Sequence, residues 1–124
     1  NRNLRSRYGR IIVPVSVAYG SDPQHVSRVL LELANAHQAI IKAGQRAAPP
    51  APAVVFTAFG TSSLDFELRA HVLDADLRGD VASELRFAIV EAFRRERIEM
   101  PYPQRDLHVR SVPAAWKAPA AGEG

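Results

Sequence analysis

The sequence predicts an α+β fold, a ferredoxin-like βαββαβ sandwich in which two helices cover one face of a mostly antiparallel sheet. Three observations carry this prediction. Two strand-like stretches are joined by a short turn of glycine, threonine and serine. Two helical stretches each follow a strand and carry one apolar stripe. A last strand-like stretch follows two prolines close to the end of the chain.

Composition fits one small soluble domain and excludes several classes of protein. The chain has 124 residues, no cysteine and a net charge of +3. It therefore has no disulfide, no thiolate metal site and no cysteine nucleophile. No stretch approaches the roughly 18 apolar residues that a membrane helix needs. Four arginines lie within the first ten residues rather than along a folded face of the kind that binds nucleic acid. This placement favours a solvated connector over an arm that grips phosphate.

The first strand is predicted over residues 10–19, where apolar residues alternate along one face. Pro14 lacks an amide proton, so its amide side must be free or lie at a bulge. Asp22 is a good N-cap and Pro23 suits the first helical position, which predicts a helix to about residue 37. Residues 38–44 are expected to extend this helix by a weaker turn. The alternating apolar face consists of Ile11, Val13, Val15, Val17 and Tyr19.

A hairpin is predicted in the middle of the chain. Residues 46–53 are rich in alanine and proline and should form an extended connection. Residues 53–59 are rich in β-branched and aromatic residues, which favours a strand. Residues 64–72 alternate between apolar residues and charged residues or histidine, which is typical of a half-buried strand. The turn at Gly60 should join the two strands.

A second helix should follow, capped by Asp74 or Asp76. Its predicted inward stripe is Val81, Leu85, Ala88, Ile89 and Ala92. Phe87 and Val90 lie off this stripe and widen the apolar face. Pro101 and the proline two residues later stop the helix near residues 95–97. A short strand is predicted over residues 106–112 and a disordered tail after it.

The predicted core joins both helices to the strand faces. Its members are Val15, Val17, Leu30, Leu33, Phe66, Leu68, Leu85 and Ile89.

No motif in the chain indicates catalysis, a cofactor or a metal. The four histidines lack ligand spacing, and the residues after Gly60 lack a partner base. An acylphosphatase-like hydrolase needs a phosphate-cradling loop and a separate asparagine, but Asn35 is predicted to lie on a helix. Asp65 and Glu67 would repel phosphate on the exposed sheet face, which argues against RNA binding. The sequence therefore predicts that the protein is not an enzyme.

Three stretches together resemble the cytoplasmic C-terminal domain of the small-conductance mechanosensitive channel (MscS) family. They are VPVSVAYGSDPQHV, then AVVFTAFGTSSLDFELRAHV with the following SELRFAIVEAFRRERIEMPYPQ, and finally RDLHVR. Their order and spacing cover roughly residues 8–112. The family usually has glycine where Arg97 stands, just past the second helix. Arg97 should cost roughly 1 kcal/mol if the same left-handed backbone is kept, unless the helix runs on slightly.

The resemblance implies a function in a membrane protein. In the family, tension-sensing pore helices and a small β domain precede this domain, and seven subunits form a hollow cage with side portals. The resemblance divides the chain into four parts. Residues 1–9 would be the exit from the β domain, and residues 10–104 would form the α/β domain. Residues 105–112 would supply a barrel strand, and residues 113–124 would be a flexible tail. The chain would be a cytoplasmic vestibule domain at the bacterial inner membrane, helping assembly and filtering ions and small osmolytes in osmotic protection. Apolar membrane helices are then expected upstream of residue 1, and no cofactor or nucleic acid is implied.

The interface expected from the resemblance lies mainly at the C-terminal end. The residues are Pro101, Tyr102, Pro103, Leu107 and Val109, with Phe87 and Val90 the first to suspect for contacts between the α/β bodies. Residues 106–112 have three possible fates in the isolated chain: pairing between subunits, folding back as a fourth strand, or staying mobile. A ligand-sensing ferredoxin-like module is the alternative function, and it would need a pocket with convergent polar groups.

Overall fold

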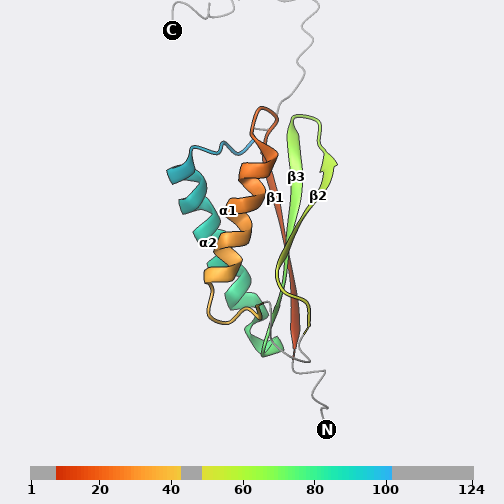
Figure 1. Cartoon of the computed structure of the whole chain (residues 1–124), viewed down its shortest axis with the longest axis vertical. Helices are drawn as coiled ribbons and strands as arrows, with labels where there is room; N and C mark the ends of the chain where they lie inside the picture. The colour runs from red at the N-terminus through yellow and green to blue at the C-terminus, as the bar shows by residue number, and fades with distance from the viewer. Residues whose placement is uncertain (1–7, 43–48, 102–124) are drawn as a thin grey trace, which may run out of the picture.

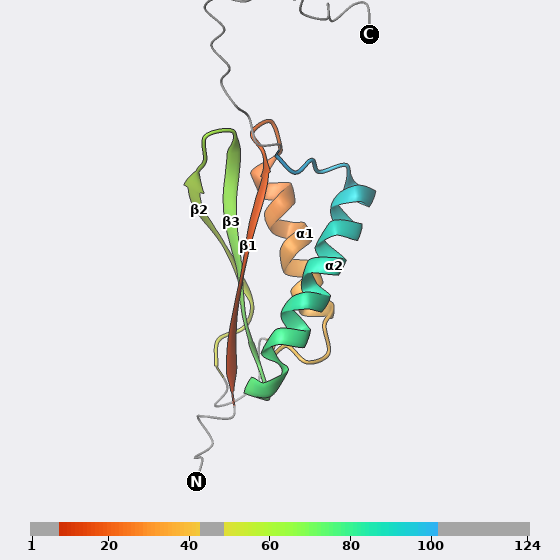
Figure 2. The same ribbon diagram turned by 180° about the vertical axis from the view of Figure 1, so that it is seen from behind.

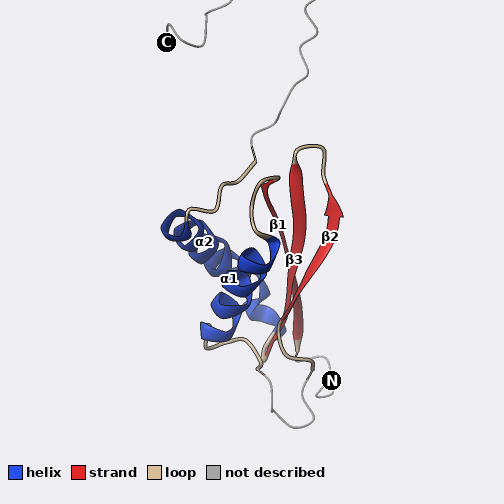
Figure 3. Ribbon diagram, turned by 45° about the horizontal axis from the view of Figure 1, so that its top comes forward, coloured by secondary structure: helices blue, strands red, loops and turns tan. Residues whose placement is uncertain are grey.

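The computed structural model describes residues 8–42 and 49–101. In chain order the elements are β1 (Gly9–Ala18), α1 (Pro23–Ala36), β2 (Ala53–Phe59), β3 (Ser63–Val72), a 3₁₀ turn η2 (Ala75–Leu77) and α2 (Arg78–Glu96). Both helices lie on one face of the sheet (Figure 1, Figure 3). This confirms the α+β prediction. The predicted fourth strand, residues 106–112, lies outside the described residues, so the complete ferredoxin-like layout stays a prediction.

The described sheet has the order β1-β3-β2, and both pairs of strands are antiparallel. The predicted alternation of the central strand β3 is confirmed, because its apolar residues are all buried and its polar residues lie on the opposite face. The hairpin is confirmed, since the Gly60 amide donates to the Ser63 carbonyl oxygen at 2.8 Å. Ser16 and Ser63 both donate hydroxyl hydrogen bonds to Asp65 Oδ1, at 2.9 and 2.8 Å, and so fasten β1 and the turn to β3.

Strand β1 is an edge of the described sheet. It pairs with β3 from Gly9 to Ala18 without a register shift, and Pro14 stands opposite Glu67 within this ladder. With no bulge present, the missing amide proton is tolerated because β1 has a free side, as predicted. The prediction that Tyr19 continues the apolar face is wrong. The strand ends at Ala18 and Tyr19 is exposed, because the chain is already turning there.

Helix α1 begins and ends as predicted. The Asp22 carboxylate accepts a hydrogen bond from the Gln24 amide at 3.0 Å, and the helix ends at Ala36. The predicted helical extension over residues 38–44 is wrong for its described part. Ile40 instead forms an isolated bridge with Val72, and the chain runs on beside the end of β3. Both Ile40 and the isoleucine after it are buried, so burial of two large apolar side chains outweighs helix propensity.

The capping prediction for α2 is wrong in one respect. The Asp74 carboxylate accepts from the Asp76 amide at 2.9 Å and caps the η2 turn rather than α2. The N-cap of α2 is Leu77, which makes no side-chain capping bond. The preceding turn of 3₁₀ helix takes the place of a capping side chain and leads directly into α2.

The core lies between the helices and the sheet. Seven of the eight predicted core residues belong to it, and Leu33 is partly buried and packs against it. Phe93 is also a core residue, only 2% exposed, although the predicted inward stripe omits it. The helices are tied together at both ends of α1: His25 Nε2 lies 3.3 Å from Glu96 Oε1, and His37 Nε2 lies 2.6 Å from Glu84 Oε1. The two helices are therefore antiparallel neighbours.

Helix α2 ends in a left-handed residue. Arg97 has φ 57° and ψ 38° and is the only non-glycine residue with positive φ in the described part of the chain. The next amide, of Ile98, donates to the Phe93 carbonyl oxygen at 2.8 Å, which is a Schellman-type closure. Of the two expectations for this position, the structure therefore has the same left-handed backbone, and the helix does not run on.

We expect Arg97→Gly to raise the free energy of unfolding by about 1 kcal/mol, because glycine adopts this backbone without a Cβ penalty. Urea denaturation followed by circular dichroism measures the change. The matched control is Arg95→Gly, inside the same helix, where glycine should lower stability by about 1 kcal/mol. A loss of stability in Arg97→Gly would show that the left-handed residue carries no strain.

Candidate functional site

The polar groups of the described residues do not gather into a reactive centre. Within residues 8–42 and 49–101, no group of three or more metal-ligating side chains could hold an ion. Every buried side-chain polar atom in that part has a hydrogen-bond partner. His25 and His37 are engaged by glutamates of α2, and His71 lies on the outer face of β3. His108 lies outside the described residues.

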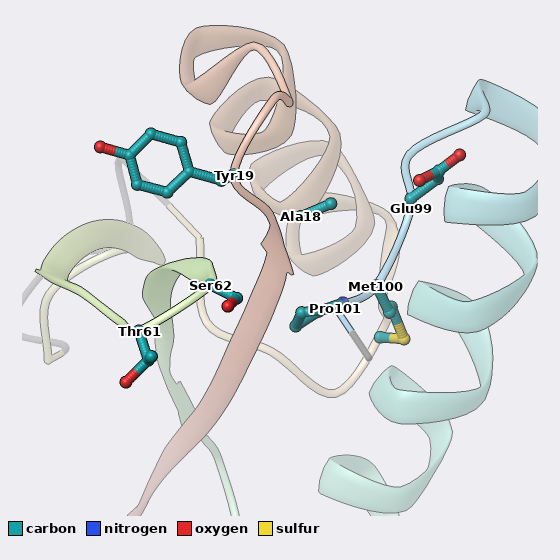
Figure 4. A pocket seen from close by; sticks show the side chains of 7 residues that line it. All are labelled: Ala18, Tyr19, Thr61, Ser62, Glu99, Met100 and Pro101. Carbon is teal, nitrogen blue, oxygen red and sulfur yellow. The ribbon is translucent and has the colours of Figure 1, made fainter. Parts of the chain in front are cut away.

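One hollow of about 380 Å³ lies where the β2–β3 turn meets the end of β1 and the segment after α2. Figure 4 shows that its polar groups diverge: the Tyr19 hydroxyl and the Glu99 carboxylate point away from each other. The remaining hydroxyls are those of Thr61 and Ser62, on the turn. A pocket with convergent polar groups, which a ligand-sensing module needs, is not formed by this arrangement.

The segment after α2 is attached to the end of β1. The Ala18 amide donates to the Glu99 carbonyl oxygen at 2.7 Å, which brings Met100 and Pro101 beside the strand. Met100 borders two hollows along α2. One, of about 220 Å³, lies between α2 and residues 13–16 of β1. The other, of about 490 Å³, runs along the last turns of α2 to Pro101.

Helix α2 exposes apolar side chains next to these hollows. Phe87 is 75% exposed and Val90 is 42% exposed, and their spacing of three residues places them on one side of the helix. Val90 and Met100 line both hollows. We call Phe87, Val90 and Met100 the α2 patch. The prediction that Phe87 and Val90 lie off the inward stripe is confirmed, but they do not contribute to the core.

A second exposed apolar surface lies on strand β2. Phe59 is 73% exposed and its ring meets that of Phe56 edge to face, with centroids 5.2 Å apart. Phe56 in turn stacks on the buried Phe66 at 4.8 Å. We call Phe56 and Phe59 the β2 patch. The sequence interpretation missed it, although the signal was present: residues 53–59 contain no charged residue.

The structure describes only three of the seven predicted interface residues. Phe87, Val90 and Pro101 lie on or beside the α2 patch, and Pro101 borders two of the hollows. Tyr102, Pro103, Leu107 and Val109 lie outside the described residues. Among the described residues, no helix has both the length and the apolar character to cross a bilayer.

Apolar surface on a helix and on an edge strand is typical of a domain that packs against other protein surfaces. Comparison with known families defines the class more closely. Residues 11–100 match the family model described as "Mechanosensitive ion channel MscS, C-terminal". The chain therefore belongs to the MscS family and corresponds to the C-terminal domain of these mechanosensitive channels.

Two curated relatives agree with this assignment. The chain is 34% identical over 111 residues to the mechanosensitive channel MscK of Escherichia coli, covering 90% of this chain and 9% of MscK. It is 32% identical over 111 residues to an uncharacterized MscS family protein of Haemophilus influenzae, covering 90% of this chain and 10% of the relative. The chain thus spans about a tenth of the length of the curated relatives it matches.

Solved structures share the fold. The closed-state crystal structure of Helicobacter pylori MscS aligns with a TM-score of 0.71 at 27% identity, over 87% of this chain and 40% of that one. The cryo-EM structure of Arabidopsis thaliana MSL1 aligns with a TM-score of 0.61 at 10% identity, over 79% of this chain and 35% of that one. At that identity the second match supports the fold alone.

Proposed function

We propose that this chain is the cytoplasmic vestibule domain of a tension-gated ion channel of the MscS type. The observation that carries the proposal is the family match over residues 11–100, together with the structural likeness to a closed MscS channel. In the whole protein the domain would help assemble a homo-oligomer, a heptamer, on the cytoplasmic face of the bacterial inner membrane. It would also filter the ions and small osmolytes that reach the pore in osmotic protection.

The described structure supports a structural role in the wall of the vestibule rather than a role as a reaction site. Its two helices and three strands share one core, so the body is rigid enough to hold a shape. The chain enters near Gly9 and leaves near Pro101 at the other end of β1 (Figure 1). A domain with its two ends far apart can stand between a preceding and a following part of the same protein.

The proposal also assigns roles to the segments before and after the α/β domain. Residues 1–9 connect it to a preceding β domain, and the bilayer is reached through segments upstream of residue 1. Residues 105–112 supply one strand to a barrel between subunits, and residues 113–124 form a tail. Pro101 supports the bridge to that strand, since proline fixes φ and stiffens the chain.

The full-length gene tests this proposal. We expect its upstream sequence to contain apolar stretches of membrane length. The protein expressed in bacteria without their own tension-gated channels should give currents in patches under suction, and should improve survival of a sudden drop in osmolarity. An upstream sequence without an apolar stretch of that length would end the channel proposal.

Deleting residues 105–124 tests the part of the proposal that concerns the last strand. We expect any ring formed by the chain to be lost, because the barrel strand is removed while the core is untouched. Native mass spectrometry or light scattering measures the mass of the assembly. If the shortened chain forms the same oligomer as the whole chain, the barrel account is wrong.

A further inference from the structure

We infer that the β2 patch of one copy of this chain packs against the α2 patch of a neighbouring copy, head to tail. The inference rests on the homo-oligomer proposed above and names the surfaces that meet. The β2 patch consists of Phe56 and Phe59, and the α2 patch of Phe87, Val90 and Met100, with the hollows beside Val90.

The placement of the two patches fits a ring. Helix α2 and strand β2 lie at opposite sides of the molecule, with α1, β1 and β3 between them, in both Figure 1 and Figure 2. A closed ring of more than two copies needs two different, complementary surfaces on each copy, whereas a two-fold dimer uses one surface twice. Two apolar patches on opposite sides supply such a pair.

Strand β2 has the character of an edge that another surface covers. In the described sheet it pairs only with β3, and its sequence AVVFTAF carries no charge and no proline. Edge strands that face water usually carry lysine, proline or a bulge that prevents pairing with other chains. Strand β2 has one of these devices, a register shift between Phe56 and Ala58, which disfavours pairing with another strand but leaves the two rings uncovered. The exposed rings therefore call for a side-chain partner rather than another strand.

The α2 patch offers an environment suited to an aromatic ring. The hollow beside Val90 and Met100 has a volume of about 220 Å³, and a protein cavity of about 150 Å³ is large enough for benzene. Arg86 lines this hollow, and Arg94 lines the neighbouring one. A guanidinium next to an apolar wall can stack on the face of an arriving phenylalanine. Phe59, the more exposed ring of the β2 patch, is the matching group.

The size of the contact predicts its strength. From the exposed fractions of their five residues, the two patches together expose roughly 500 Å², which is a minor part of the roughly 1,600 Å² of a standard stable interface. A pair of isolated chains should therefore associate only transiently. In a ring each copy makes this contact twice, and other parts of the protein add to it. The test must accordingly trap a short-lived contact.

The absence of cysteine from the chain makes site-specific cross-linking direct. Thr61→Cys marks the turn beside Phe59, and Glu91→Cys marks α2 beside Val90; both positions are exposed. Each variant of the 124-residue chain is treated with a short bis-maleimide, alone and as an equal mixture. We expect a cross-linked heterodimer in the mixture, little product from either variant alone, and a ladder of larger species from the double variant.

Substitutions in the patches show whether the trapped contact is the proposed one. Phe59→Ala in the Thr61→Cys chain should lower the heterodimer yield roughly tenfold, because the central ring is lost. Phe87→Ala in the Glu91→Cys chain should also lower it. Leu73→Ala is the matched control, since Leu73 is exposed but lies outside both patches, and it should leave the yield unchanged.

Two results would overturn the inference. Efficient cross-linking of either single variant with itself would mean a two-fold contact, and no product from the mixture would mean that these surfaces do not meet. Currents from the full-length channel are measured separately. If the channel works but this cross-link does not form, the proposed interface is wrong and the channel proposal stands. If the channel gives no current under tension, the channel proposal is weakened, but the cross-linking result is unaffected.

Discussion

Phe93→Ala should lower the free energy of unfolding by about 3–5 kcal/mol, the range expected for a large aromatic side chain removed from a packed core. Phe93 is 2% exposed and belongs to the cluster that joins α2 to the sheet. The loss is a large part of the 5–15 kcal/mol typical of a domain. Urea denaturation at low temperature, followed by circular dichroism, gives the measurement. Phe93→Leu keeps most of the volume and should lose less.

Phe87→Ala is the matched control for Phe93. It removes the same side chain from the same helix, but Phe87 is 75% exposed. A surface substitution of this kind is expected to change stability by no more than about 0.5 kcal/mol. Equal losses in the two variants would mean that α2 faces the sheet with a different side. A large loss of stability in Phe87→Ala alone would mean that Phe87 is the buried residue and Phe93 the exposed one.

Leu68→Ala is the second substitution with a large expected effect, about 2–5 kcal/mol. Leu68 is fully buried in the middle of the central strand β3, opposite Val13 of β1 and Val54 of β2. The space it leaves is enclosed by two strands and the helices, so the surroundings can collapse into it only in part.

The same denaturation experiment measures the loss for Leu68→Ala. Leu73→Ala, one residue past the end of β3 and exposed, should change stability by less than about 0.5 kcal/mol. A loss that small in Leu68→Ala would mean that the register of β3 is wrong, because a slip of one residue moves every side chain to the opposite face of the sheet.

Features with strong local causes could be predicted from the sequence. Alternation along β3 placed Phe66 and Leu68 in the core, and Asp22 with Pro23 marked the start of α1, because a strand's period and a helix cap depend on neighbours in the chain. For Arg97, the two predicted alternatives were a left-handed backbone and a longer helix. The left-handed alternative depended on the family resemblance, since arginine itself has no preference for that conformation.

Features set by contacts distant in the sequence were missed. Residues 38–42 look helical, but Ile40 and Ile41 are buried beside the end of β3, which no local pattern indicates. Phe93, by contrast, has a local signal that the predicted stripe omits: it lies four residues after Ile89, on the same side of α2, and it is buried. The β2 patch has a signal in the uncharged sequence of residues 53–59, but strand propensity alone does not tell whether Phe59 is buried or exposed.

The hydrogen bond from the Ala18 amide to the Glu99 carbonyl oxygen, 2.7 Å long, also determines how force passes through this domain. Strand β1 begins at Gly9 and ends at Ala18, close to the segment that leaves through Pro101. A strand is already extended at about 3.3 Å per residue and lengthens little under tension. A pull between residues 8 and 101 is therefore carried by β1 and this bond, in parallel with the longer path through the helices. While the Ala18–Glu99 bond holds, the pull passes mainly along β1 and loads the β1–β3 ladder and α2 little. Once that bond breaks, the same pull shears the ladder over its ten register positions and stretches α2.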